Sequence, residues 1–129
     1  ITHQIINRKK IHLWSLIAGG IGFISMYFIS NHNLLLISFS LIGISWGSIL
    51  SMPYAMLSSS VKEESMGTSM GIFNMFIVIP QIIAAIGGIN LLTNLIGDKV
   101  IFSMVVAGLS LIIAGLLNLL INDKKTISY

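Results

Sequence analysis

Two side-chain amides, Asn74 and Gln81, lie in a stretch from Ser65 to Gly97 that contains no Asp, Glu, Lys or Arg. Their spacing of seven residues places both on one face of a helix. An earlier uncharged stretch contributes the phenol of Tyr54. Amides and phenols both donate and accept hydrogen bonds. Within apolar helices such groups either fasten helices to one another or face water and a ligand. The sequence leaves both interpretations open.

Small residues accompany these polar groups at steps of three and four residues, which places each set on one helical face. The earlier set comprises Ser40, Gly43, Gly47, Ser51, Ala55 and Ser58. The later set comprises Gly67, Gly71, Asn74, Val78, Gln81, Ala85 and Gly88. We call these sets the first and second small-residue stripes. Stripes of this kind are typical of close helix packing, as are Gly19, Gly20 and Gly22 further upstream.

A proline lies inside each of the two stretches, Pro53 in the first and Pro80 in the second. An interior proline removes a helix hydrogen bond and bends the helix. In a membrane this is tolerated where a neighbouring helix or a water-filled cavity takes up the freed carbonyl. Both helices are therefore candidates for lining a cavity.

The sequence lacks the residues that disulfide bonds, metal sites or catalysis would require. The chain has no cysteine, which excludes disulfides and thiolate metal sites. The three histidines lack the i, i+4 spacing of a helical metal site, and we expect them at interfaces or termini: His3, His12 and His32. Glu63 and Glu64 lie beside Lys62 and are expected to be a solvated cluster. We therefore predict no catalytic residue, no metal site and no cofactor, and a protein that is not an enzyme.

Charge is confined to short clusters, and this decides the class of protein. Only 9% of the residues are charged, against about a quarter in soluble domains, and 55% are hydrophobic. A charge at the centre of a bilayer costs about 2.5–3.5 kcal/mol even on insertion scales. The uncharged stretches 11–61, 65–97 and 100–122 therefore indicate an integral membrane protein.

Four membrane-spanning helices follow from the lengths of these stretches. A hydrocarbon core of about 30 Å needs about 20 helical residues. A polar turn at Ser30–Asn33 divides the first stretch. Since lipid cannot satisfy backbone polar groups, each segment must be helical, and we expect an all-α bundle. The expected helices are residues 11–29, 34–60, 66–96 and 100–121, between a loop at 1–10 and a tail at 123–129.

Basic residues indicate the orientation. Arg8, Lys9 and Lys10 precede the first span, and Lys124 and Lys125 follow the last. The positive-inside rule then places both ends in the cytoplasm. The net charge of +3 is explained by topology and does not suggest nucleic acid. Because the chain opens on Ile1 instead of Met, we expect a fragment of a longer protein.

Two segments resemble consecutive helices of a known family. Residues 46–57, WGSILSMPYAML, resemble the tenth helix of sugar transporters of the major facilitator superfamily. More narrowly, they resemble sucrose/maltose:proton symporters and the related glycoside–pentoside–hexuronide:cation symporters. Residues 70–82, MGIFNMFIVIPQI, resemble the eleventh helix, where a G-x-x-N…x-I-P-Q pattern follows a short cytoplasmic loop. The resemblance covers residues 39–88, and the remainder is similar only in hydropathy. In this superfamily the loop before such a span often carries a G-x-L-x-D-x-x-G-R-K motif. Here only Arg8 and Lys9 fit it, because Gln4 stands at the Asp position and Asn7 at the second Gly position.

This resemblance implies that the four spans are helices 9 to 12 of a twelve-helix bundle, with helices 10 and 11 lining the central cavity. It implies a secondary active transporter. The heavy use of Ile, Asn and Lys suggests an AT-rich bacterial genome, so we expect the bacterial inner membrane. The substrate would be a sugar, such as the disaccharides sucrose or maltose, moved with a proton or sodium by alternating access. The spans contain no carboxylate, and in the family the N-terminal half commonly supplies the coupling site. The residues expected to contact substrate are Tyr54, Asn74, Gln81, Ser51 and Trp46.

A different class of protein fits the same stripes. A stand-alone four-helix membrane protein could scaffold or regulate a partner, with the small-residue stripes as oligomer interfaces. The sequence fixes neither the exact substrate, the coupling ion, the direction of transport nor the oligomeric state.

Overall fold

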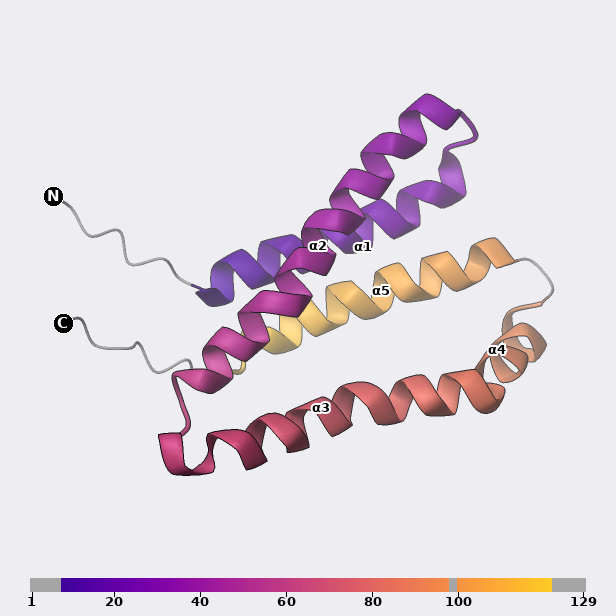
Figure 1. The fold of residues 1–129 in the computed structure, drawn as a ribbon. Helices are drawn as coiled ribbons and strands as arrows, with labels where there is room; N and C mark the ends of the chain where they lie inside the picture. Colours follow the sequence, from indigo (N-terminus) through magenta and orange to yellow (C-terminus); the bar gives the residue numbers. More distant parts are fainter. Residues whose placement is uncertain (1–7, 98–99, 122–129) are drawn as a thin grey trace, which may run out of the picture.

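The computed structural model describes residues 8–97 and 100–121, and these form helices joined by short turns (Figure 1). The elements in chain order are α1 (Arg8–Phe28), α2 (His32–Ser58), the 3-10 turn η1 (Glu63–Ser65), α3 (Met66–Ile83), the π-helical segment η2 (Ala84–Gly88), α4 (Ile89–Ile96) and α5 (Val100–Asn118). The predicted all-helical class is confirmed for this part of the chain.

Four helical segments are long and apolar enough to cross a membrane: Arg8–Phe28, His32–Ser58, Glu63–Gly88 and Val100–Asn118. Most boundaries shift by one to three residues from those expected, and two differences are informative. Helix α1 begins at Arg8, so the basic cluster forms its first turn instead of a preceding loop. The single helix expected over residues 66–96 is divided by the π-helical segment that follows Pro80. A π-helical turn interrupts the regular hydrogen-bond pattern of a helix.

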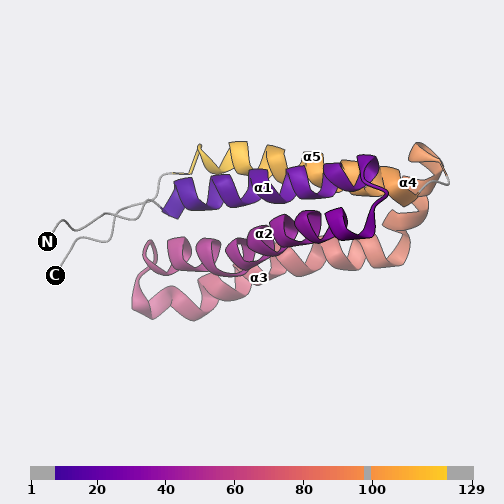
Figure 2. The same cartoon turned by 90° about the horizontal axis from the view of Figure 1, so that it is seen from above.

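Helix α1 packs against both α2 and α5, and Figure 2 shows it between them. Glycines make this packing close. A Cβ added to Gly20 would lie 2.5 Å from Ile112 Cγ1 and 2.7 Å from the backbone oxygen of Gly108. A Cβ added to Gly22 would lie 2.8 Å from the backbone oxygen of Ser38. Such distances are too short for real side chains, so the two interfaces depend on glycine.

Hydroxyl groups add polar contacts between α1 and α2. The Oγ atoms of Ser25 and Ser38 are 2.7 Å apart. The buried face of α2 consists of Ser38, Ser45, Ser48 and Met56. This face lies on the opposite side of α2 from the first small-residue stripe. Small residues suit this interface because they allow close approach. Ser38 and Ser48 also bond to α1, whereas Ser45 Oγ is buried without a hydrogen-bond partner.

Basic side chains at the start of α1 bind the ends of both neighbouring helices. Arg8 donates from Nη1 to the backbone oxygen of Ala55 at 2.7 Å and from Nη2 to Ser59 Oγ at 3.0 Å. Lys9 Nζ donates to the backbone oxygen of Leu119 at 3.0 Å. Cations at the carbonyl ends of helices complement the helix dipole. The two side chains therefore cap α2 and α5, and we call this pair the basic clamp.

Helix α3 has no buried residue and diverges from α2 after η1 (Figure 1). Its exposed side chains are mostly large and apolar, among them Ile72, Met75 and Phe76. Its contacts with α2 are few and lie near the connecting turn. The described residues thus form a packed unit of α1, α2 and α5, with α3 attached at one end.

We predict that Gly20→Ala destabilises the protein by about 1–3 kcal/mol, because the added methyl group forces the α1 and α5 backbones apart. The measurement is thermal unfolding of the detergent-solubilised protein, followed by circular dichroism. Gly43→Ala is the matched control, because nothing lies within 4 Å of a Cβ added there. Equal unfolding temperatures for the two variants would contradict the close contact at Gly20.

Candidate functional site

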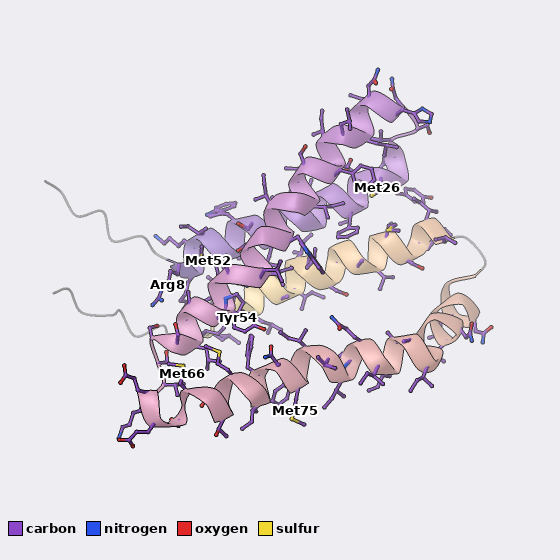
Figure 3. All side chains as sticks on the ribbon, viewed as in Figure 1. Arg8, Met26, Met52, Tyr54, Met66 and Met75 are labelled. Atoms are coloured by element: carbon purple, nitrogen blue, oxygen red, sulfur yellow. The ribbon has the colours of Figure 1, made fainter. Side chains whose placement is uncertain are left out.

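Tyr54 of α2 and Asn74 of α3 come together although they lie on different helices. The Tyr54 hydroxyl donates a hydrogen bond to Asn74 Oδ1. The Tyr54 ring also meets the ring of Phe73 edge to face, with centroids 5.0 Å apart. Figure 3 shows Tyr54 in the space between α2 and α3. Two of the five residues expected to contact substrate are therefore direct neighbours.

The other three candidates lie apart from this pair. Gln81 is exposed on α3, two turns beyond Asn74. Ser51 is exposed, and its hydroxyl donates to the backbone oxygen of Gly47 at 2.8 Å. Trp46 is 60% exposed. The structure brings Tyr54 and Asn74 together and leaves Gln81, Ser51 and Trp46 on uncovered helix surface.

Both small-residue stripes are open over the turns that carry their glycines. No atom of the described residues lies within 4 Å of a Cβ added to Gly43 or Gly47 in α2. The same holds for Gly67 and Gly71 in α3. These glycines therefore make no close helix contact within the described part of the chain. Their faces are available to a ligand, to lipid or to further protein.

A cavity of about 660 Å³ lies among α1, α2, α3 and α5. Most of its lining is aliphatic or aromatic, as with Leu16 and Phe73. Its polar lining residues are His12, Ser60 and Asn118. Tyr54 and Asn74 are not among its lining residues, but Phe73, whose ring contacts Tyr54, lines it.

His12 is the functional candidate that sequence reasoning missed. We expected an interfacial or terminal histidine, and the structure adds that His12 is 7% exposed and hence buried against the neighbouring helices. Its Nδ1 and the Oγ of Ser48 on α2 are 2.8 Å apart. A signal was present in the sequence: His12, Ser15, Gly19 and Gly22 recur at steps of three and four residues. That spacing places them on one face of α1.

Asn118 was also missed. It is 3% exposed, and its Nδ2 donates to the backbone oxygen of Lys9 at 2.8 Å. Its Oδ1 is buried without a hydrogen-bond partner. A lone polar residue near the end of an apolar helix has no partner in the local sequence, and its role appears only when α5 meets α1.

The site offers uncharged donors and acceptors. Within residues 8–97 and 100–121, no three His, Asp or Glu side chains gather in a way that could hold a metal ion. Asp98, Lys99, Asp123, Lys124 and Lys125 lie outside the described residues. What the described helices present is hydrogen-bonding capacity beside open glycine-rich faces, which suits reversible binding of a neutral polar molecule.

Comparison with known families supplies the remaining observation. The model of the Major Facilitator Superfamily matches residues 3–128, nearly the whole chain. Comparison with curated proteins and with solved structures gave no significant match. Members of this superfamily are membrane transporters and not enzymes, which agrees with four apolar helices able to span a bilayer. The expected superfamily is confirmed, whereas the narrower likeness to sucrose and maltose symporters is not supported by this match. The chain belongs to the Major Facilitator Superfamily of membrane transporters.

Proposed function

We propose that these residues are helices 9 to 12 of a secondary active transporter that moves a sugar together with a cation. The observation that carries the proposal is the hydrogen bond between Tyr54 and Asn74 beside two open small-residue stripes. The resemblance of residues 46–57 and 70–82 to the tenth and eleventh helices of sugar symporters supports the same substrate class.

A sugar presents many hydroxyl groups, each both donor and acceptor. Tyr54, Asn74, Gln81 and Ser51 match such groups because they are uncharged and can both donate and accept. In the absence of substrate, Tyr54 and Asn74 satisfy each other. A bound sugar hydroxyl inserts between them and replaces that bond with two. Trp46 adds an aromatic surface on which a sugar ring can stack.

Room for the substrate comes from the glycines. With no side chain at Gly43, Gly47, Gly67 and Gly71, a ligand can approach the helix backbone closely. A disaccharide such as sucrose or maltose is the size of substrate that we propose.

Prolines give the two helices a place to bend during transport. Pro53 immediately precedes Tyr54, and Pro80 immediately precedes Gln81. Each proline removes one helix hydrogen bond, and the π-helical turn at Ala84–Gly88 follows the second. Alternating access rocks two bundles around a midplane site. Helices weakened beside the site can follow that motion, whereas an uninterrupted helix would resist it.

Coupling needs a cation, which we propose to be a proton or sodium. The described spans contain no Asp or Glu apart from Glu63 and Glu64 in the turn before α3. The remaining helices of the same transporter would supply any carboxylate. We place the protein in a bacterial inner membrane with both ends of this segment in the cytoplasm, in agreement with its basic clusters.

We predict that Asn74→Ala and Gln81→Ala in the full-length transporter each lower the uptake of labelled sucrose or maltose by up to about tenfold. One lost hydrogen bond is worth about 0.5–1.5 kcal/mol. Uptake is measured in cells lacking other sugar carriers, with the amount of protein in the membrane measured alongside. Asn33→Ala, which removes an exposed amide at the start of α2, is the matched control. Unchanged uptake in both site variants, at equal membrane levels, would remove these residues from the site.

We further predict that Tyr54→Phe raises KM for the sugar about threefold to tenfold. The substitution deletes the hydroxyl that donates to Asn74 and keeps the ring contact with Phe73. Because both residues serve one substrate group, the double variant with Asn74→Ala should lose less than the two single effects combined. Tyr27→Phe, which removes a hydroxyl near the C-terminal end of α1, is the control. Fully additive effects would show that Tyr54 and Asn74 act separately.

The open stripes also suit a second function, a stand-alone scaffold or regulatory subunit whose stripes are oligomer interfaces. Two observations separate the two proposals. A reading frame that continues upstream of Ile1 through about eight further spans favours the transporter. A four-span protein that copurifies with a membrane partner and moves no sugar favours the scaffold.

A further inference from the structure

His12 is a buried ionisable residue that has no role in binding a neutral sugar. Of the His, Asp, Glu, Lys and Arg side chains that the structure describes, it is the one that is buried. It lies in α1, on the first turns of a helix able to span the membrane. A buried ionisable group in a membrane segment is costly and is a functional candidate by default.

The geometry leaves one ring nitrogen available. Nδ1 lies 2.8 Å from Ser48 Oγ, so α1 and α2 together fix the orientation of the ring. The ring also lines the cavity of about 660 Å³. Asn118 of α5 lines the same cavity, and its Oδ1 is a buried acceptor without a partner. His12 and Asn118, together with Ser60, are therefore the polar residues that line this mostly apolar cavity.

The charged groups around His12 disfavour a permanently protonated ring. On its own helix, Arg8 and Lys9 lie one turn earlier, and both bind the ends of α2 and α5. The facing turn of α2 presents Ser48, and the described part of α5 presents Asn118. No described carboxylate neutralises an imidazolium there, since Glu63 and Glu64 are exposed in η1 beside Lys62. A charged ring is therefore favoured only while water fills the cavity.

We propose that His12 binds and releases the coupling proton of the transporter, an inference that rests on the proposed cation-coupled transport. With Nδ1–H donated to Ser48 Oγ, the lone pair of Nε2 forms a bond to a proton delivered by cavity water. The ring becomes an imidazolium of charge +1. The same N–H bond breaks when the proton returns to water, and the ring is neutral again. The partial negative charge of Asn118 Oδ1, a residue that lines the same cavity, favours the charged state. This assigns a proton, and not sodium, as the coupling ion.

The test uses the full-length transporter in sealed vesicles. An inward gradient of about one pH unit supports about tenfold accumulation of a solute carried with one proton. For His12→Asn we expect this accumulation to fall to about onefold while sugar counterflow still proceeds. Asparagine keeps an N–H donor for Ser48 and cannot bind a proton near neutral pH. His32→Asn makes the same change at an exposed position and should accumulate sugar as the wild type does.

Accumulation by His12→Asn equal to that of the wild type overturns the proposal. A second measurement does not depend on the variant: NMR of the wild type with isotope-labelled histidine in lipid nanodiscs. Reversible titration of the His12 ring between about pH 5 and 8 supports the proposal, and a ring that stays neutral throughout that range overturns it. If the wild-type protein transports neither sucrose nor maltose, the proposed substrate is wrong. The NMR titration still tests the role of His12 in that case.

Discussion

The close approach of α1 to its two neighbours is the interaction on which the rest of the described structure depends. Lipid tails are as apolar as leucine, so the hydrophobic effect cannot hold helices together inside a bilayer. Van der Waals contact and interhelical hydrogen bonds must do so instead. Gly20 lies against Gly108 of α5, and Gly22 lies against Ser38 of α2, so closely that neither glycine has room for a Cβ. Only at this separation can short hydroxyls such as Ser25 and Ser38 bond across the interface.

The same close approach gives the basic residues a structural role beside their topological one. When α1 lies against α2 and α5, its first turn meets the carbonyl ends of both helices, and Arg8 and Lys9 reach those carbonyls. Charges that the membrane excludes from its interior are thus used at its edge to complete helix ends. The buried His12 follows one turn later, at the boundary between this polar layer and the apolar cavity.

Packing is unevenly distributed over the described helices, and this bears on the proposed transport. The α1, α2 and α5 unit is joined by glycine contacts and hydroxyl pairs, whereas α3 meets α2 through Tyr54, Phe73 and Asn74. Elements that move during function are drawn from the least packed parts of a protein. Helix α3 contacts α2 at few residues and is interrupted after Pro80 before α4 meets α5, so α3 can shift at small cost. The residues that would recognise the sugar also form this joint, so substrate binding would act directly on the position of α3.

The sequence by itself determined the class of protein, its four spans and the faces of its helices. A charge in lipid costs free energy whatever its neighbours are, and bilayer thickness sets the length of a spanning helix. Membrane spans can therefore be recognised from the sequence without knowledge of the tertiary structure. Spacing placed Asn74 and Gln81 on one face of α3, but Tyr54 and Asn74 meet only because two separate helices are rotated toward each other. Likewise, the small residues of α2 predicted a packing face, yet α1 packs on the face of Ser38, Ser45 and Ser48. Periodicity shows which residues share a face of one helix. Which face is buried, and therefore whether His12 is buried, depends on the neighbouring helix and on its crossing angle.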